Sequence, residues 1–404
     1  MDPRSIKIED YTYHLPADKI AEFPLAERDQ SRLLHYEGRK IEDRTFSDIT
    51  SLIPSNSLLV LNNTRVIEAR LLFRKPTGAQ VELFCLEPQG QPVEQALQSR
   101  SAVVWKCMIG GASKWKPGQL LQKEVSAGAT VVLLTAKYLS KEEDSFLIEF
   151  SWTNNSQFAE VLHEAGAIPL PPYIKRSAQQ LDSQRYQTVF GIQEGSVAAP
   201  TAALHFTDQL LQEIKTKAKV DFITLHVGAG TFKPVKTETI ADHRMHAEPF
   251  TVHRRLVEQL ISSDYTIAVG TTSLRSLESL YWLGVKLRCG ELNDWSLGQW
   301  EAYDLGKHEV PVKESLTVVR NWMIEHDAAE LHCSTSLIIV PGYHIKIPSA
   351  LITNFHQPQS TLLLLVAAFV GEDWRKIYDH ALQQNYRFLS YGDSSFLQRA
   401  PRLF

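Results

Sequence analysis

Two short segments combine small residues with a histidine, which suits them to line a substrate pocket. The first is Gly195-Ser-Val-Ala-Ala-Pro-Thr-Ala-Ala-Leu-His-Phe206, and the second is Ile223-Thr-Leu-His-Val-Gly-Ala-Gly-Thr-Phe-Lys-Pro-Val235. Small residues let a ligand approach the backbone closely, and histidine transfers protons near neutral pH. Either segment alone is equally typical of a tight turn beside a packed histidine. The two together, separated by a predicted helix over about 207–217 and a strand, predict a pocket.

Polar residues follow a predicted buried strand at Leu58–Leu61. The chain continues there as Asn62-Asn-Thr-Arg65. Asn and Thr at a strand end hydrogen-bond the backbone or a ligand, and Arg65 could bind a carboxylate or phosphate through two parallel hydrogen bonds. An ordinary turn is the alternative interpretation.

A second predicted strand, Tyr265–Val269, leads through Gly270 into a helix. Free backbone N–H groups and the helix dipole favour an anion at such a junction. The cap would be one of three residues, Thr271, Thr272 or Ser273. The segment lacks the second glycine and the lysine of a nucleotide-binding P-loop.

Two later segments add candidate site residues. The first, His243-Arg-Met-His246-Ala-Glu248, lacks the spacing of zinc proteases, and Pro249 ends any helix there, so polar contacts are favoured over a metal shell. The second is the polar loop 353–361, in which Asn354 and His356 could line the site. Ser360 is predicted to cap the apolar helix that follows this loop.

The composition favours an ordinary soluble enzyme. The chain has 404 residues, of which 44% are hydrophobic and 22% charged. Its first residues lack the apolar core of a signal peptide, and the longest apolar run, Leu362–Val370, is about half of a membrane span. Four scattered cysteines fit a reducing compartment. We therefore expect a cytoplasmic protein without membrane contact. A net charge of −4 gives no bulk attraction to nucleic acid, so RNA binding would need a local basic patch.

The pattern of predicted secondary structure changes between residues 70 and 151. Short β-rich runs alternate there with glycine turns, which predicts a small antiparallel barrel or sandwich. Helices and strands alternate afterwards. The expected fold is therefore α/β, with a main domain made of residues 1–69 and 152–404 and a β-barrel domain inserted at 70–151.

The segments above resemble the S-adenosylmethionine:tRNA ribosyltransferase-isomerases of queuosine biosynthesis, usually called QueA. The matching stretches run in order through nearly the whole chain. They are Arg28–Leu34, Asn62–Val66, Ile168–Ile174, Tyr186–Val189, Gly195–Phe206, Thr224–Val235, His243–Glu248, Gly270–Ser279 and Thr353–Thr361.

The resemblance implies a specific reaction. Enzymes of this family transfer the ribosyl group of S-adenosylmethionine to 7-aminomethyl-7-deazaguanine in the tRNA anticodon and isomerise it. The products are epoxyqueuosine, adenine and methionine. The family is expected to use no metal and no cofactor beyond S-adenosylmethionine as co-substrate, and its architecture is an α/β domain with an inserted β-barrel. The partner would be the anticodon stem-loop of queuosine-type tRNAs, and we expect a monomer.

The resemblance also suggests roles for the residues. A base must remove a proton from the ribose carbon beside the sulfonium, and a second group should protonate the departing adenine. The catalytic candidates are His205 and His226, then His243 and His246. The candidates for binding substrate are Asn63, Arg65, Tyr173, Arg176, Thr201, Gly228, Gly230, Glu248, Thr271, Thr272, Ser273, Arg275, Asn354 and His356. Among these, Thr271 to Ser273 would hold the methionine carboxylate or an RNA phosphate.

This sequence departs from the family pattern at several positions. Ala203 stands where glycine is usual, and Gln357 replaces a leucine. A stretch at 293–331 is expected to be an insertion atypical of the family. These changes leave two alternatives open. One is a divergent paralogue that uses S-adenosylmethionine with another acceptor, and the other is a non-catalytic RNA-binding protein.

Overall fold

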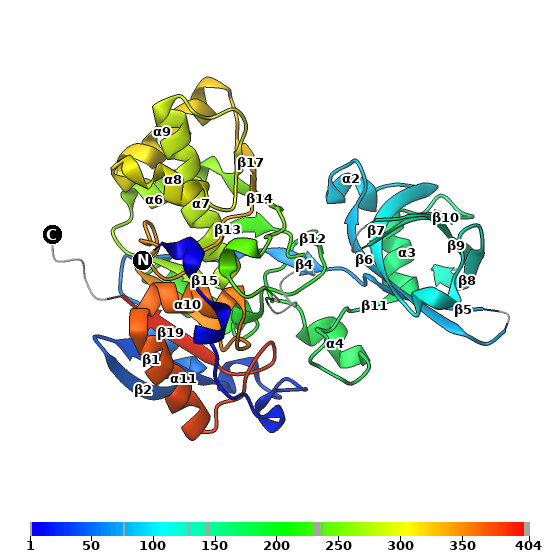
Figure 1. Ribbon diagram of the computed structural model, residues 1–404, viewed down its shortest axis with the longest axis horizontal. Helices are drawn as coiled ribbons and strands as arrows, with labels where there is room; N and C mark the ends of the chain where they lie inside the picture. Colours follow the sequence, from blue (N-terminus) through cyan, green and yellow to red (C-terminus); the bar gives the residue numbers. More distant parts are fainter. Residues whose placement is uncertain are drawn as a thin grey trace.

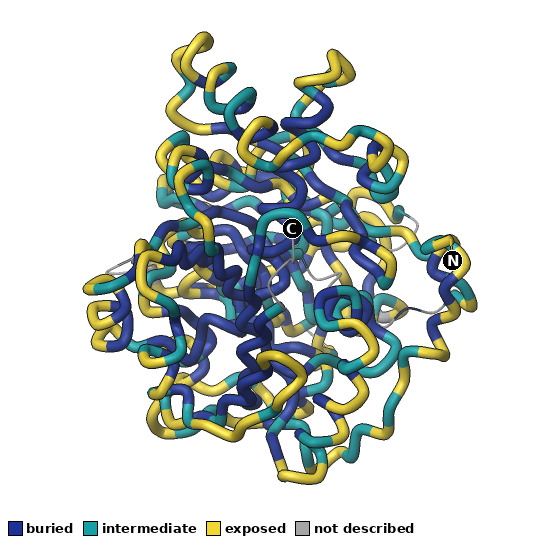
Figure 2. Tube along the Cα trace, turned by 90° about the vertical axis from the view of Figure 1, so that its left-hand side faces the viewer, coloured by how far each residue is buried: buried dark blue, intermediate teal, exposed yellow. Residues whose placement is uncertain are grey.

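The protein has a mixed α/β fold with two large sheets (Figure 1). The computed structural model describes residues 2–75, 77–127, 130–142, 145–228, 235 and 237–399. Most of the chain forms a body that holds both described ends, and the second sheet projects from it at the right of Figure 1. Buried chain runs through the centre of the body, whereas exposed segments lie at its rim (Figure 2).

The body is built on a ten-stranded sheet with the order β16-β17-β14-β13-β3-β15-β18-β19-β1-β2. Its strands are β1 Arg32–Glu37, β2 Lys40–Thr45, β3 Leu58–Asn62, β13 Lys219–Leu225, β14 Glu248–His253, β15 Thr266–Val269, β16 Ser296–Leu297, β17 Glu330–Thr335, β18 Ala350–Asn354 and β19 Ser394–Gln398. The four central strands β13, β3, β15 and β18 run parallel to one another. Their carboxyl ends therefore meet at one edge, which is where ligands bind in open α/β sheets.

Further helices lie outside the second sheet. They are α1 Ile49–Leu52, α4 Gln180–Arg185, α5 Asp208–Lys215, α6 Arg254–Ser262, α7 Thr271–Cys289, α8 Glu301–Asp304, α9 Val312–Glu325, α10 Thr361–Val370 and α11 Trp374–Gln383. Helix α7 is buried almost throughout its length. It passes so close to α9 that a Cβ on Gly284 would lie 2.2 Å from Ser315 Oγ. Segment 293–331, which contains α8 and α9, thus contributes Leu316, Val319 and Met323 to the main core.

The second sheet is antiparallel, with seven strands in the order β11-β5-β6-β7-β10-β9-β8. The strands are β5 Arg70–Arg74, β6 Gln80–Pro88, β7 Ala102–Gly110, β8 Leu120–Ala127, β9 Thr130–Lys141, β10 Phe146–Trp152 and β11 Gly166–Ala167. The sheet curls so that β5 and β8 approach each other. Buried residues alternate along β6 and β7 and pack with helix α3 (Phe158–Ala165) around Trp105. Helix α2 (Val93–Leu97) lies in the β6–β7 connection.

A small parallel pair, β4 (Thr64–Val66) and β12 (Gln193–Ser196), connects the end of β3 to the segment before the first histidine turn. That turn contains the short 3-10 helix η7 (Thr201–Ala203). Ala203 is fully buried there and is not among the described residues with positive φ. An alanine therefore fits this turn without backbone strain.

Most of the elements predicted from the sequence are confirmed, together with the mixed α/β class. Thr207 caps α5 and Ser360 caps α10, each by accepting a hydrogen bond from a backbone N–H of the first turn. Two predictions are wrong. The sequence also predicts a strand at Ser336–Val340, but strand β17 ends at Thr335, and Leu337–Val340 are buried without belonging to a strand. The N-cap of α7 is Gly270 (φ 88°) rather than Thr271, Thr272 or Ser273.

In the part of the chain that the structure describes, no helix is both long and apolar enough to span a membrane.

Candidate functional site

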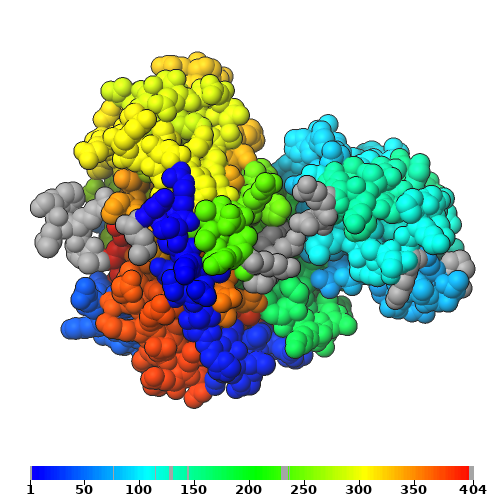
Figure 3. Space-filling model, in the orientation of Figure 1, coloured from blue at the N-terminus to red at the C-terminus, as the bar shows by residue number. Residues whose placement is uncertain are grey.

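Two neighbouring cavities lie at the carboxyl edge of the central strands. The larger one, here called the large cleft, has a volume of about 930 Å³ and lies between the two sheets. The smaller one, here called the small pocket, measures about 90 Å³. Val227 and Leu362 line both cavities, so the two adjoin. Figure 3 shows that the seven-stranded sheet and its helices α2 and α3, here called the seven-stranded unit, lie beside the body.

His226 lies in the large cleft immediately after β13, and its partner comes from the other unit. Its Nε2 lies 2.9 Å from Oε1 of Glu94 on α2. This hydrogen bond is the main cause that lowers the pKa of Glu94. An ionised carboxylate can only accept, so Nε2 carries the hydrogen. Nδ1 of neutral His226 is then a proton acceptor, and it has no partner among the described residues.

Gly195 permits this contact between the units. Its φ is +133°, and a Cβ there would lie 2.8 Å from Val93 and 3.0 Å from His226 Nδ1. Any side chain would therefore push α2, which carries Glu94, away from the histidine.

A buried ion pair forms another wall of the large cleft. Arg275 on α7 donates from Nη1 to Glu248 Oε2 at 2.6 Å, and its Nε donates to the carbonyl of Leu337 at 3.1 Å. Arg275 is 4% exposed and Glu248 is 7% exposed. The second terminal nitrogen of Arg275, Nη2, is buried without a described partner. A planar guanidinium with one free donor edge can bind an anionic or carbonyl oxygen.

The segment that precedes β14 completes the cleft with His243 and His246. Gln299 fixes this segment, because its amide donates to the His243 carbonyl at 2.7 Å and accepts from the Met245 N–H at 2.9 Å. Burial lowers the pKa of His243, and neighbouring His246 lowers it further. His246 is exposed at the mouth of the cleft.

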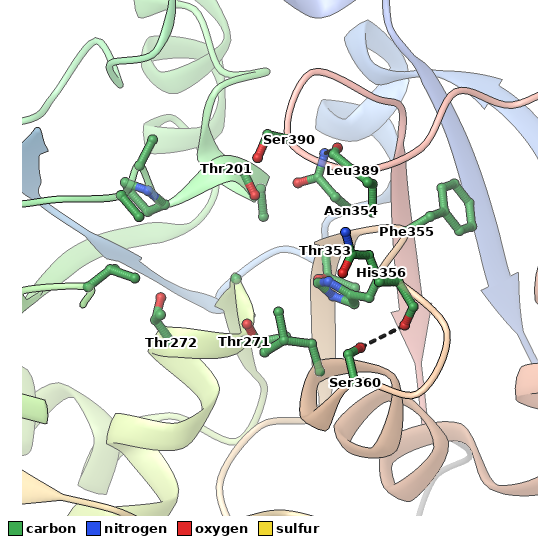
Figure 4. Close-up of a pocket in the computed structure, with 18 of the residues that line it drawn as sticks. Thr201, Thr271, Thr272, Thr353, Asn354, Phe355, His356, Ser360, Leu389 and Ser390 are labelled. Atoms are coloured by element: carbon green, nitrogen blue, oxygen red, sulfur yellow. Dashed lines mark hydrogen bonds between the residues drawn. The ribbon is translucent and has the colours of Figure 1, made fainter. Parts of the chain in front are cut away.

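The small pocket faces the start of α7 (Figure 4). Thr271 and Thr272 lie on one side of it, and Asn354, His356 and Ser390 lie on the other. Tyr173 and Thr201 also line it. Tyr173 shares a 2.6 Å hydrogen bond with Ser390, and burial raises its pKa to about 12.

His205 lies behind this wall and lines neither cavity. Its Nδ1 is 2.8 Å from Ser31 Oγ, and its Nε2 is 3.2 Å from Asn354 Nδ2. Burial and then the charge of Arg387 lower its pKa to about 3, so the ring is neutral. The hydrogen bond to Asn354 links His205 to the wall of the pocket. This position does not suit direct proton transfer to a ligand.

His356 does line the small pocket. Its Nε2 is 2.9 Å from Thr353 Oγ1, and burial lowers its pKa to about 3. It is therefore a neutral polar group at physiological pH.

Four other candidates for substrate binding lie away from both cavities. Asn63 holds the end of β13 by accepting from Thr224 at 2.7 Å, and Arg65 is exposed beside Glu194. Arg176 is bound by both oxygens of buried Asp182 at 2.7 and 2.8 Å, so its guanidinium is occupied. Ser273 is fully buried within α7.

Two glycines were also candidates for substrate binding. Gly228 lines the large cleft, and Gly230 falls outside the described residues. Within the described ranges, no group of three or more His, Cys, Asp or Glu side chains is placed to hold a metal ion.

Sequence reasoning missed Glu94 and Ser31. Glu94 lies 132 positions before its partner, in a stretch that showed only turns and β-rich runs. Ser31 lies 174 positions before His205. The Arg176–Asp182 pair, in contrast, spans only six positions and could have been recognised as a local structural pair.

Comparison with known proteins gives consistent matches along the chain. The model of a family described as queuosine biosynthesis protein matches residues 8–397. Proteins named S-adenosylmethionine:tRNA ribosyltransferase-isomerase from Dechloromonas aromatica and an Azoarcus species are each 37% identical over 401 residues. The alignments cover 98% of this chain and 97% or 98% of theirs. A solved S-adenosylmethionine tRNA ribosyltransferase from Thermotoga maritima is 27% identical, with a TM-score of 0.45, and the match covers 96% of this chain and 99% of that one.

Proposed function

The chain belongs to the queuosine biosynthesis protein family, and we propose that it is an S-adenosylmethionine:tRNA ribosyltransferase-isomerase. The reaction transfers the ribosyl group of S-adenosylmethionine to 7-aminomethyl-7-deazaguanine in the tRNA anticodon. Isomerisation yields epoxyqueuosine, and adenine and methionine are released. The enzyme acts in the cytoplasm as a monomer, with S-adenosylmethionine as co-substrate and no further cofactor.

The observation that carries the mechanism is the pairing of His226 with Glu94 in the large cleft. Glu94 fixes the tautomer of His226, so the unpartnered Nδ1 is the base that removes the proton from the ribose carbon beside the sulfonium. The ionised carboxylate also stabilises the imidazolium that forms, as in other histidine–carboxylate pairs.

The other residues of the large cleft have roles that follow from their chemistry. His243 and His246, which both line the large cleft, are the candidates for protonating the departing adenine. The unpartnered Nη2 of Arg275 is suited to a developing oxyanion, since it is a buried hydrogen-bond donor that the pairing of Nη1 with Glu248 leaves free. Gly228 leaves room for the nucleoside beside them.

We also propose that residues 70–151 form an inserted β-barrel domain, on which α3 and β11 pack. In this arrangement the inserted domain closes one side of the large cleft and supplies Glu94. The anticodon stem-loop would enter between the two units, where Arg244 lines the cleft. Arg65 and Arg176 are less suited to RNA, because each already has a carboxylate neighbour.

The test is adenine release from S-adenosylmethionine, measured with tRNA that carries the 7-aminomethyl-7-deazaguanine base and with tRNA that lacks it. Release that depends on this base, with epoxyqueuosine in the product tRNA, is the expected result. Release that occurs equally without the base would indicate a divergent enzyme with another acceptor. RNA binding without any release would indicate a non-catalytic protein.

A further inference from the structure

The amide of Asn354 is held in one orientation at the wall of the small pocket. Its Nδ2 lies 3.2 Å from His205 Nε2 and faces the carbonyls of Leu389 at 3.3 Å and Asp393 at 3.4 Å. Two carbonyl oxygens can only accept hydrogen bonds, so the nitrogen must be the atom on that side. The carbonyl Oδ1 of Asn354 is therefore directed away from this cluster.

Asn354 Oδ1 is a buried acceptor with no partner among the described residues. Asn354 is 2% exposed and lines the small pocket. Leaving such an acceptor unpaired costs free energy, so a structure that fixes it in place is prepared for a donor from a ligand.

The opposite side of the small pocket offers donors. Helix α7 begins at Thr271 and runs for 19 residues, and in the described chain no side chain caps its first turn. Its N-cap, Gly270, and the first two helical residues, Thr271 and Thr272, all line the pocket. Unpaired backbone N–H groups at the positive end of a long helix favour a carboxylate.

The net charge of the lining limits the choice of ligand. Of the described residues that line the small pocket, none is Asp, Glu, Lys or Arg. Burial lowers the pKa of the pocket histidine, His356, to about 3, so it too is neutral. A neutral lining with donors on one side and an acceptor on the other matches a zwitterion rather than a phosphate or an isolated cation.

We propose that the small pocket binds the amino-acid end of S-adenosylmethionine, with the α-ammonium on Asn354 Oδ1 and the α-carboxylate on the first turn of α7. This inference rests on the proposed function, since it assigns a subsite to that co-substrate. The adjoining large cleft then receives the ribosyl and adenine parts, next to His226.

His205 and Ser31 become positioning residues in this arrangement. Because Asn354 donates to Nε2 of His205, the ring hydrogen lies on Nδ1 and is donated to Ser31 Oγ. The low pKa of His205 keeps Nε2 available as an acceptor. The pair thus holds the Asn354 amide in the orientation that presents Oδ1.

The test compares two ligands that differ in the amino-acid end. S-Adenosylmethionine has that end and 5′-methylthioadenosine lacks it. Binding of each is measured by calorimetry in the presence of saturating unmodified tRNA. Asn354→Leu keeps the size of the side chain but removes the acceptor, and should lower the affinity for S-adenosylmethionine about 10- to 100-fold. The affinity for 5′-methylthioadenosine should stay within about threefold of the wild-type value.

Two further variants keep the inference testable if Asn354→Leu does not fold. His205→Phe keeps a ring against Phe46 but removes the acceptor for Asn354. Ser31→Ala removes the acceptor that keeps the ring hydrogen of His205 on Nδ1. Each variant should lower the affinity for S-adenosylmethionine about 3- to 10-fold and leave the affinity for 5′-methylthioadenosine unchanged. A merely structural role would lower the affinity for both ligands.

The outcomes separate this inference from the proposed function. Equal weakening of both ligands, or no change in either, would overturn the assignment of Asn354 while leaving the function standing. A wild-type protein that binds neither ligand would overturn the proposed function itself.

Discussion

Glu94 on helix α2 accepts a hydrogen bond from His226 at the end of strand β13, with Nε2 and Oε1 2.9 Å apart. Helix α2 lies in a connection of the seven-stranded sheet, and His226 follows a strand of the ten-stranded sheet. The cleft that the two residues share lies between those sheets. The catalytic histidine that we propose is therefore oriented only when the seven-stranded unit is docked on the body. The proposed proton transfer therefore depends on how the two units pack together.

Glu94→Gln should lower turnover about tenfold or more, because the uncharged amide no longer fixes the tautomer of His226 or stabilises its charged form. Adenine release under saturating substrates measures the effect. Glu164→Gln, an exposed carboxylate on α3 of the same unit, is the matched control and should retain normal turnover. Equal rates for the two variants would remove Glu94 from the mechanism.

Gly195→Ala should lower both stability and turnover. The new methyl group would clash with Val93, which lies 2.8 Å from the Cβ position, and would displace α2 and Glu94. The expected destabilisation is about 1–3 kcal/mol. Gly90→Ala also places alanine at a positive φ, but nothing lies within 4 Å of its Cβ position, so it should lose stability without losing turnover. Urea denaturation and adenine release measure the two effects, and an active, stable Gly195→Ala protein would contradict the contact.

Arg275→Met should destabilise the protein by about 3 kcal/mol, because Glu248 then remains buried without its partner. The double variant Glu248→Leu with Arg275→Met should recover most of that stability, since both charges are gone. It should not recover turnover, because the free donor edge of Arg275 is lost as well. Denaturation curves and single-turnover rates for the three proteins separate the structural role from the functional one. Recovery of turnover in the double variant would show that Arg275 only balances charge.

The buried neutral histidines predict a pH dependence of stability. Burial lowers the pKa of His356 to about 3, whereas a histidine in the unfolded chain binds a proton near its ordinary pKa of about 6.5. Below that pH the unfolded chain binds a proton that the folded protein does not, so stability falls as the pH drops toward 3. The loss from this group is about 2 kcal/mol between roughly pH 7 and pH 5.

His356→Gln removes that titration and should flatten the pH dependence by a similar amount. The free energy of unfolding of both proteins at the two pH values, measured in urea, gives the comparison. An unchanged slope in the variant would contradict the neutral, buried state of His356.

Local signals predicted most of the elements that position the site. The sequence predicted the helix over about 207–217, the helix that Ser360 caps, and the buried strand at Leu58–Leu61. The structure brings the residues after β13, β15 and β18 to one edge, although the sequence predicted each of these segments separately.

The partners of the site residues could not be predicted, because they are distant in the chain. Nothing near Glu94 marked it as the partner of His226, and nothing near Ser31 marked it as the partner of His205. The same limitation explains why the sequence favoured His205 for catalysis, since its burial depends on how β18 and β19 pack around it. The atypical insertion expected at 293–331 stays a prediction, although its helices are part of the main core.

The most direct test of the proposed mechanism is the fate of deuterium at the ribose carbon beside the sulfonium. S-Adenosylmethionine labelled there is incubated with tRNA that carries the 7-aminomethyl-7-deazaguanine base and with wild-type or His226→Ala protein. We expect the wild type to remove one deuteron per turnover, and His226→Ala to bind S-adenosylmethionine but to remove deuterium at least a hundredfold more slowly, on the order expected for loss of a general base. Removal by His226→Ala at nearly the wild-type rate would contradict the assignment of His226 as the base.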